Sequence, residues 1–358
     1  MLDNLKMKKK YLFSVPMPFD KQAINDLVKL NETLNKSKVS TLYNNFPFPF
    51  TKNLNDYFSL NRGINENIKS FEDFRQYVEY AQEKGFHFVY LMNSPKNFSE
   101  DDFKKIQNFF FELMDFLCEI NCTEIKFSNF QVINIINKYY PNKFDYSVST
   151  TCEYSMIEEY KNLITKYPNI RRIIVSYNQN QNFLFLKNLK KIIPGTKIEV
   201  MLNEPCIKGC PGRTAHFSSS FHRYDCFQED QLKSFCKSSR VYPWTLEYYS
   251  KCNINSFKLV PFPLPRATFS DIRYIKNYLY FVEGNCKNVS ANYFFSELWG
   301  MTNRIPDDIK LSEIQKLLPD VKYFVENGYK CSSICNIDCS YCDDCAKKLN
   351  KRLKQYFD

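Results

Sequence analysis

The chain has 358 residues, a formal net charge of +10 and a hydrophobic fraction of 44%. This length is enough for one large barrel with an appendage or for two ordinary domains, and no apolar run approaches the roughly 20 residues that cross a bilayer. The basic N-terminal stretch lacks a long apolar segment with a cleavage site, so we expect no signal peptide and no membrane association. We therefore expect a cytoplasmic protein whose fourteen cysteines are reduced thiols.

Short apolar segments alternate with helical patterns along residues 11–283, and Asp20 is placed to cap the first helix. Eight strands, each followed by a helix, predict an α/β fold, a parallel (β/α)8 TIM-like barrel, although a doubly wound open sheet shows the same alternation. The predicted strands are 11–16, 39–43, 86–92, 124–128, 145–149, 171–176, 197–202 and 256–260. The predicted helices are 20–35, 71–84, 99–120, 130–138, 154–166, 181–193, 228–237 and 270–283.

The alternation stops near residue 285. Residues 285–305 are aromatic and irregular in pattern, residues 307–329 are mostly helical, and a cysteine-rich tail follows. We therefore expect two parts: a barrel over residues 1–285, with a cluster-binding loop after its seventh strand, and a helical, cysteine-rich C-terminal extension over residues 286–358.

The loop after the seventh predicted strand concentrates reactive residue types. It contains Cys206, Cys210 and Cys226, and it follows a strand whose C-terminal end lies, in such barrels, on the face that carries the chemistry. Iron–sulfur clusters are commonly held by four thiolates, and a short spacing lets one loop supply two of them. We expect these three cysteines to bind a 4Fe-4S cluster.

The fourth ligand of this cluster is open among three cysteines. Cys252 precedes the eighth strand, the neighbour of the seventh in a barrel, and is our first choice; Cys236 is nearer in sequence, and Cys286 lies beyond the barrel. For the remaining thiols of the barrel half, ordinary burial as small apolar groups is the expectation. These are Cys118, Cys122 and Cys152.

The tail is a second candidate metal site. Five cysteines follow at gaps of four, four, three and three, which suits zinc held by four thiolates or a second iron–sulfur cluster. We favour iron–sulfur because the tail contains no histidine, and zinc remains the alternative. The five residues are Cys331, Cys335, Cys339, Cys342 and Cys345.

The tail sequence CNIDCSYC resembles the cluster-binding motif of radical S-adenosylmethionine enzymes. In that family the motif precedes most of the barrel, whereas here it follows the barrel. Two explanations are open: a permuted barrel, or a likeness confined to cluster-binding spacing. We favour the second.

Four residues of the seventh loop are candidate catalytic groups. Glu204 is suited to act as a general base or to bind a substrate cation, and equally to pair with a nearby arginine. Arg213 is suited to bidentate capture of a carboxylate or phosphate, or to a structural ion pair. His216 and His222 are suited to proton transfer or metal ligation, or to bonding the loop backbone.

Two cations near the eighth strand are candidate substrate-binding groups. Lys258 lies within the strand, where an inward lysine needs a charged partner, and Arg266 lies in the following loop, where it is suited to an anionic group. The chain's other histidine, His87, lies in an aromatic strand and is expected to be packed in the core.

The order of these features resembles the collagenase-like peptidase family U32. The resemblance covers residues 10–285 and is most specific in NEPCIKGCPGRTAHF, at Cys210, Pro211, Arg213 and His216. It implies a 4Fe-4S cluster at Cys206, Cys210, Cys226 and one more thiol. It also implies oxygen-independent hydroxylation of tRNA, ribosomal RNA or quinone precursors, as in members of that family.

The sequence lacks the residue patterns of proteolysis. It contains no HExxH motif, no glycine-rich phosphate loop and no spacing that argues for a Ser-His-Asp triad. We therefore expect an iron–sulfur enzyme that modifies an RNA, peptide or anionic small molecule, with an electron donor as partner. Two alternatives are a non-catalytic RNA-binding or assembly protein, supported by the basic segment 347–354, and a permuted radical S-adenosylmethionine enzyme.

Overall fold

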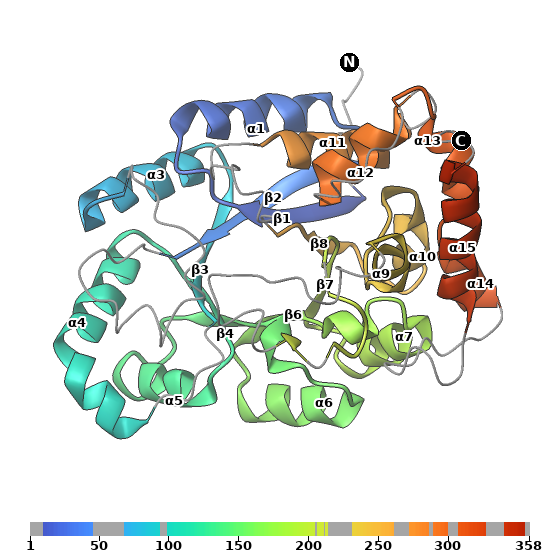
Figure 1. Ribbon diagram of the computed structural model, residues 1–358. Coiled ribbons are helices and arrows are strands. Elements are labelled where there is room, and N and C mark those ends of the chain that lie inside the picture. Colours follow the sequence, from blue (N-terminus) through green and yellow to red (C-terminus); the bar gives the residue numbers. More distant parts are fainter. Residues whose placement is uncertain are drawn as a thin grey trace, which may run out of the picture.

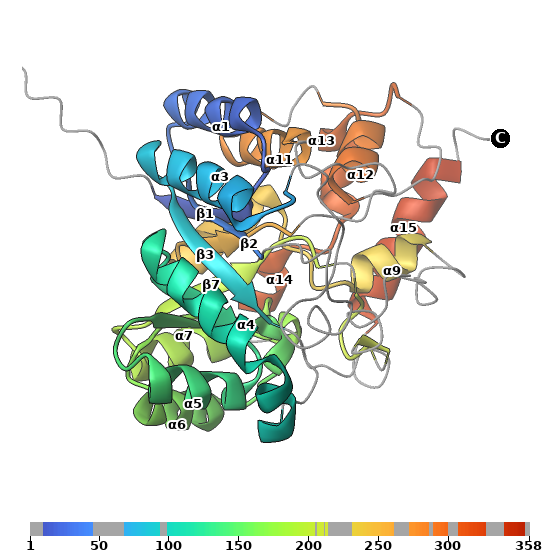
Figure 2. The same ribbon diagram turned by 90° about the vertical axis from the view of Figure 1, so that its left-hand side faces the viewer.

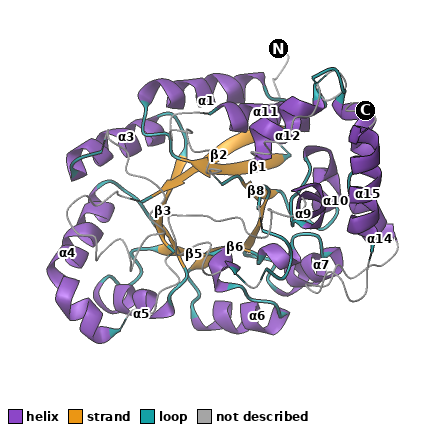
Figure 3. Ribbon diagram, in the orientation of Figure 1, coloured by secondary structure: helices purple, strands orange, loops and turns teal. Residues whose placement is uncertain are grey.

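The chain folds around a closed parallel barrel. The computed structural model describes residues 10–45, 68–93, 99–204, 206–210, 212–213, 231–260, 272–285, 289–299, 307–326 and 340–354. Within these residues, eight strands pair in chain order and the eighth closes on the first, which confirms the (β/α)8 prediction and excludes the open sheet (Figure 1, Figure 3). The strands are β1 (Tyr11–Pro16), β2 (Ser37–Asn44), β3 (His87–Met92), β4 (Glu124–Phe127), β5 (Asp145–Val148), β6 (Ile170–Ile174), β7 (Lys197–Met201) and β8 (Ser256–Lys258).

Helices surround the barrel, as the alternation predicts (Figure 3). The predicted cap of the first helix is present, because the Asp20 side chain accepts a hydrogen bond from the Ala23 amide at 2.8 Å. No described helix combines the length and the apolar character needed to cross a bilayer. The helices over the barrel are α1 (Lys21–Thr33), α3 (Phe71–Glu83), α4 (Glu100–Glu119), α5 (Phe130–Tyr139), α6 (Ile157–Lys166), α7 (Phe183–Ile192), α9 (Gln231–Lys237), α10 (Leu246–Ser250) and α11 (Arg273–Val282).

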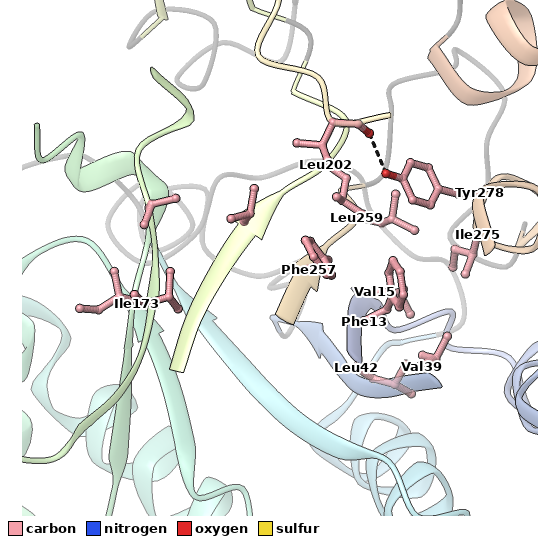
Figure 4. Close-up of a cluster of buried hydrophobic side chains, with 14 of the residues drawn as sticks. Phe13, Val15, Val39, Leu42, Ile173, Leu202, Phe257, Leu259, Ile275 and Tyr278 are labelled. Carbon is pink, nitrogen blue, oxygen red and sulfur yellow. Dashed lines mark hydrogen bonds between the residues drawn. The ribbon is translucent and has the colours of Figure 1, made fainter. Parts of the chain in front are cut away.

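The apolar core lies between the outer face of the barrel and the helices. Figure 4 shows one part of it, where alternate residues of β1 and β8 pack against Ile275 and Tyr278 of α11. The Tyr278 hydroxyl donates a 2.6 Å hydrogen bond to the Val241 carbonyl, so this buried polar group is satisfied. Each large apolar side chain buried here contributes about 1.5–3 kcal/mol. The buried residues in this part are Phe13 and Val15 of β1, Phe257 of β8, and Leu259, which directly follows β8.

The C-terminal residues pack on the barrel through α9 and α11. The prediction of irregular structure over 285–305 is wrong in part, because residues 291–299 form a helix whose Phe295 ring lies 4.8 Å from the Phe235 ring of α9. The last helix lies beside α9, and Figure 2 shows both on the side toward which the β3 arrow points. The helices of this part are α12 (Ala291–Trp299), α13 (Leu311–Ile314), α14 (Val321–Glu326) and α15 (Tyr341–Lys354).

Candidate functional site

The seventh loop leaves the barrel at the C-terminal end of β7, as expected for a catalytic face. Asn203 anchors this exit to the neighbouring chain: its side chain donates to the Val260 carbonyl at 2.8 Å and accepts from the Val260 amide at 2.9 Å. Gly209 has a positive φ of 66°, a conformation that glycine adopts without strain, and it turns the chain between the two cysteines of this loop. The loop is therefore held at the rim of the barrel by defined contacts.

Arg213 is the charged centre of this rim. Its Nη1 atom lies 2.7 Å from Glu204 Oε1, its Nε atom lies 3.0 Å from Glu153 Oε1, and its guanidinium carbon lies 3.6 Å from the centre of the Tyr177 ring. The Arg213 and Glu204 side chains are only 2% and 3% exposed. The pairing of Glu204 with an arginine, one of its two expected roles, is present. The carboxylates contact the edge of the planar guanidinium and the tyrosine ring stacks on its face, so the orientation of the Arg213 side chain is fixed.

The charges at the rim stabilise one another. Burial alone would raise the pKa of Glu204, but the adjacent Arg213 guanidinium holds it below its ordinary value. Burial alone would lower the pKa of Arg213, and the Glu204 carboxylate and the Cys206 thiol raise it above its ordinary value. Burial raises the pKa of Tyr177, which stays a neutral hydroxyl. Both members of the ion pair are therefore charged near neutral pH.

Cys206 and Cys210 lie together in the apolar part of the rim. They belong to one buried cluster with Ile174, Tyr177 and Met201, separate from the main core. The Cys206 amide donates to Glu204 Oε1 at 3.0 Å, and the Cys210 amide donates to the Tyr177 hydroxyl at 3.2 Å. The residues that orient Arg213 thus also fix the backbone of both cysteines. We call these five clustered residues the mouth cluster.

The inside of the barrel contains charged residues, where such barrels usually contain branched apolar ones. Arg172 of β6 joins two carboxylates: its Nη1 atom donates to Glu199 Oε1 at 3.0 Å, and its Nη2 atom donates to Glu124 Oε2 at 3.2 Å. Ser14 and Ser256 also donate to Glu199, at 2.6 and 3.1 Å. All five side chains are buried, so this network replaces an apolar filling of the barrel.

The two inner carboxylates are strongly acidic. Burial alone would raise the pKa of Glu124, but the hydrogen bond to His87 and the charge of Arg172 lower it to about 2. Burial would likewise raise the pKa of Glu199, and Arg172 and Lys126 lower it to about 2. The prediction of a core position for His87 is wrong. Its side chain is 43% exposed at the start of β3 and lies 2.6 Å from Glu124.

Lys258 points into the barrel, where its ammonium group lies near the Tyr43 ring. Lys126 lies near the same ring, and Lys126 was not among the residues predicted from the sequence. The Lys258 Nζ atom lies 4.2 Å from the centre of the Tyr43 ring, and the Lys126 Nζ atom lies 5.1 Å from it. Lys126 also lies 3.6 Å from Glu199. The sequence did contain a pattern that indicates both lysines. Each is the third residue of its strand, β4 or β8, and the alternation of side chains along a strand directs it into the barrel.

Cys252 is not brought to the other two thiols. It precedes β8, whereas Cys206 and Cys210 follow β7, and parallel strands place these positions at opposite ends of the barrel. Cys252 lies in the main core, where its Sγ atom faces the Phe183 carbonyl at 3.8 Å. The prediction of Cys252 as the fourth ligand was therefore wrong. It relied on β8 being next to β7, and neighbouring strands do not determine at which end of the barrel a residue lies.

Part of the predicted site lies outside the described residues. The seventh-loop members in this group are Cys226, His216 and His222, and the others are Arg266, Cys286, Cys331, Cys335 and Cys339. Within the part of the chain that the structure describes, no three or more His, Cys, Asp or Glu side chains are grouped so as to hold a metal ion. The two described seventh-loop thiols suit an iron–sulfur cluster chemically, because both are buried and Cys206 lies within electrostatic range of Arg213.

The two described cysteines of the tail lie near a third thiol. Cys342 and Cys345 are buried on α15, three residues apart and so on one helix face. Burial raises the pKa of Tyr242 well above its ordinary value, and the neighbouring thiols Cys236, Cys342 and Cys345 raise it further. Cys236 of α9 is thus a neighbour of the tail. Asp343 joins the two helices through Lys237, at 3.0 Å.

Comparisons with known proteins give similarity in fold. No known protein-family model matches the sequence, and no curated protein matches it. The U32 peptidase Mk0906 is 9% identical over 71% of this chain and 93% of its own, with a TM-score of 0.45. The isomaltulose synthase SmuA from Protaminobacter rubrum is 10% identical over 96% of this chain and 83% of its own, with a TM-score of 0.40. Similarities this low carry no argument about activity.

Proposed function

We propose that this chain is an iron–sulfur enzyme of the U32 type. It would modify an RNA, peptide or small-molecule substrate by oxygen-independent, hydroxylation-type chemistry, and not by proteolysis. The observation that supports this most directly is the burial of Cys206 and Cys210 in one cluster at the barrel mouth, beside the Arg213 guanidinium. Soft thiolates at the catalytic end of a (β/α)8 barrel suit iron and sulfide better than hydrolytic chemistry.

Four thiolates would hold the cluster. Cys206 and Cys210 are the two described ligands, and Cys226 is the third on the basis of the sequence. With Cys252 at the other end of the barrel, Cys236 and Cys286 remain for the fourth position. A bound cluster would supply one-electron transfer, or Lewis-acid chemistry if one iron is left open to substrate, and the first role requires an electron donor.

The chain's own residues prepare the site. The Glu204 carboxylate and the Tyr177 hydroxyl accept from the cysteine amides, which fixes the direction of both ligands. The Arg213 cation offsets negative charge at the thiolates, and its ion pair with Glu204 keeps it in place. We assign anion binding to Lys258 and Arg266, and proton transfer to His216 and His222.

We also propose a metal site in the tail. Cys342 and Cys345 on one face of α15 would supply two ligands, with the others from Cys331, Cys335 and Cys339. A second iron–sulfur cluster is favoured over zinc, because the tail offers five thiols and no histidine.

Iron analysis of cysteine variants tests the seventh-loop assignment. Protein purified without oxygen is compared with Cys210→Ser, with Cys342→Ser and with the control Cys252→Ser. We expect Cys210→Ser to lose the seventh-loop iron, Cys342→Ser to lose only the tail metal, and Cys252→Ser to keep both. Equal iron in Cys210→Ser and in the unmodified protein would contradict the assignment.

An RNA-binding or assembly protein is the second candidate. The exposed cations of α15, which include Lys347, Lys348 and Lys351, form a basic helix surface suited to phosphates. Binding of an RNA oligonucleotide that weakens steeply with salt, together with no change of redox state on reduction, would favour this candidate. Reversible reduction of bound iron would favour the enzyme.

A further inference from the structure

Two lysines from opposite walls of the barrel face the same aromatic ring. Lys126 comes from β4 and Lys258 from β8, four strands apart in a closed barrel of eight. Their ammonium groups lie 5.1 and 4.2 Å from the centre of the Tyr43 ring, whose hydroxyl donates to the Leu259 carbonyl. Because that hydrogen bond fixes the tyrosine, the two cations stand at defined positions around one point inside the barrel.

This point lies next to the mouth cluster. Lys258 is in register with Met201 on the neighbouring strand, and Met201 packs with Cys206 and Cys210. The charged network of Arg172 lies on the other side, toward the N-terminal ends of the strands, since Glu199 precedes Met201 by one inward position. A group held by the lysines would therefore lie between that network and the thiols.

The buried lysine Lys126 is poorly matched by the protein. It is 0% exposed, its Nζ atom makes no hydrogen bond, and its nearest carboxylate oxygen, from Glu199, is 3.6 Å away. That oxygen is Oε2, whereas Arg172, Ser14 and Ser256 all donate to Oε1 of the same carboxylate. An ammonium group has three donors, and leaving them unused inside a protein costs free energy. An anion at Lys126 would satisfy them.

The charged residues inside the barrel also favour an anion at this position. Among the described residues, three inward cations, Lys126, Arg172 and Lys258, face two inward carboxylates, Glu124 and Glu199. Both carboxylates are fully ionised near neutral pH, because their pKa values are lowered to about 2 despite burial. In this region of low dielectric, an anion beside the Lys126 ammonium, whose Nζ atom makes no hydrogen bond, would be attracted strongly.

We propose that Lys126 and Lys258 bind a carboxylate or phosphate group of a small-molecule substrate, which places the rest of that substrate against the mouth cluster. This deepens the proposed function and rests on it for the chemistry that follows binding. The two lysines are 0% and 5% exposed, so the phosphates along an RNA strand do not reach them. The substrate is therefore a small molecule with a terminal anionic group. Binding of RNA at this site is the alternative result that the experiments below would reveal.

Calorimetric titration with inorganic phosphate and, separately, with succinate tests the site at constant ionic strength. The variants are Lys258→Met and the control Lys191→Met, which changes an exposed lysine on α7. We expect one or both anions to bind the unmodified protein and the control equally, and Lys258→Met at least about 10-fold more weakly. The preferred anion separates phosphate from carboxylate. Equal binding to Lys258→Met, or no binding of either anion, would overturn the proposal.

Lys126 needs a second measurement, since its removal alone leaves Glu199 with one cation fewer and risks misfolding. The rate at which each lysine is acetylated is measured by peptide mass spectrometry, with and without the bound anion. We expect the anion to slow acetylation of Lys126 and Lys258 and to leave Lys191 unchanged. Unchanged rates at all three would contradict the proposal.

Two further readouts separate this site from the proposed cluster and from RNA. Iron content of Lys258→Met is expected to equal that of the unmodified protein, so a failure of anion binding with iron intact leaves the cluster proposal standing. Conversely, anion binding in an iron-free protein leaves the lysine site standing. An RNA oligonucleotide that displaces the bound anion in competition would overturn the small-molecule assignment.

Discussion

The Arg213 guanidinium lies 2.7 Å from the Glu204 carboxylate, with both side chains almost completely buried at the rim of the barrel. The pair is built by one loop: Glu204 leaves β7 and Arg213 returns nine residues later to meet it. Because a buried charge without its partner is costly, this contact holds the loop in one conformation. The position of Cys206 and Cys210 depends on that conformation.

Replacement of Glu204 by glutamine is therefore expected to destabilise the protein. It leaves the Arg213 cation with the half-exposed Glu153 as its remaining carboxylate partner among the described residues, and we expect a loss of about 3–5 kcal/mol in the free energy of unfolding. Urea unfolding measures the loss. Glu158→Gln, which changes an exposed carboxylate of α6, is the control and is expected to stay within about 0.5 kcal/mol. A loss of the same size in the control would contradict the assignment.

Acidification is expected to destabilise the barrel between about pH 4.5 and pH 2. The pKa values of Glu124 and Glu199 lie at about 2 in the folded chain, against an ordinary value of 4.5. A carboxyl group with a lowered pKa stabilises the folded state above its unfolded pKa, and that contribution is lost as the pH falls toward the folded value. Urea unfolding over a pH series measures it. Constant stability down to pH 2 would be inconsistent with this network.

Two neighbouring arginines on β6 give a matched comparison. Arg172 joins two buried carboxylates, whereas Arg171 forms an exposed pair with Asp145 and is 61% exposed. Lysine cannot donate to both carboxylates in the way the planar guanidinium does. We expect Arg172→Lys to lower the free energy of unfolding by about 2–4 kcal/mol and Arg171→Lys by less than about 0.5 kcal/mol. Similar losses in both variants would refute a special role for Arg172.

The docking of α15 on α9 is expected to depend on Asp343. Its carboxylate lies 3.0 Å from Lys237 and 3.4 Å from Lys233, whereas the adjacent Asp344, among the described residues, forms an ion pair with Lys347 of its own helix. Asp343→Asn should increase cleavage in the C-terminal part during limited proteolysis several-fold, and Asp344→Asn should not. Identical digestion of the two variants would show that the apolar contacts of α15 are sufficient.

The sequence pattern predicted the barrel well because each strand and helix is encoded locally. β1 occupies the predicted residues, and β3 to β7 begin and end within two residues of the prediction. Apolar residues facing the helices recur at period two in the strands, and turn residues separate the segments. The helix over 291–299 was missed because four of its nine residues are aromatic, a composition that is as typical of strands as of helices.

The inner network could not be predicted from local pattern. Arg172 meets Glu124 and Glu199 across 48 and 27 residues of chain, so only the closed barrel brings them together. The error over Cys252 has the same cause. The sequence correctly indicated that Cys252 lies next to β8, the neighbour of β7, but only the parallel topology shows that it lies at the opposite end of the barrel from Cys206 and Cys210. Cys206 and Cys210 were found because they lie four residues apart in one loop, where spacing alone implies proximity.

Iron and acid-labile sulfide in protein prepared without oxygen test the central claim most directly. Thiolates of the seventh loop that hold a 4Fe-4S cluster predict about four irons and four sulfides per chain, or about eight of each if the tail binds a second cluster. The preparation should be coloured and should bleach on reduction. A colourless preparation without iron and sulfide, whose Cys206 and Cys210 react freely with thiol reagents, would contradict the account.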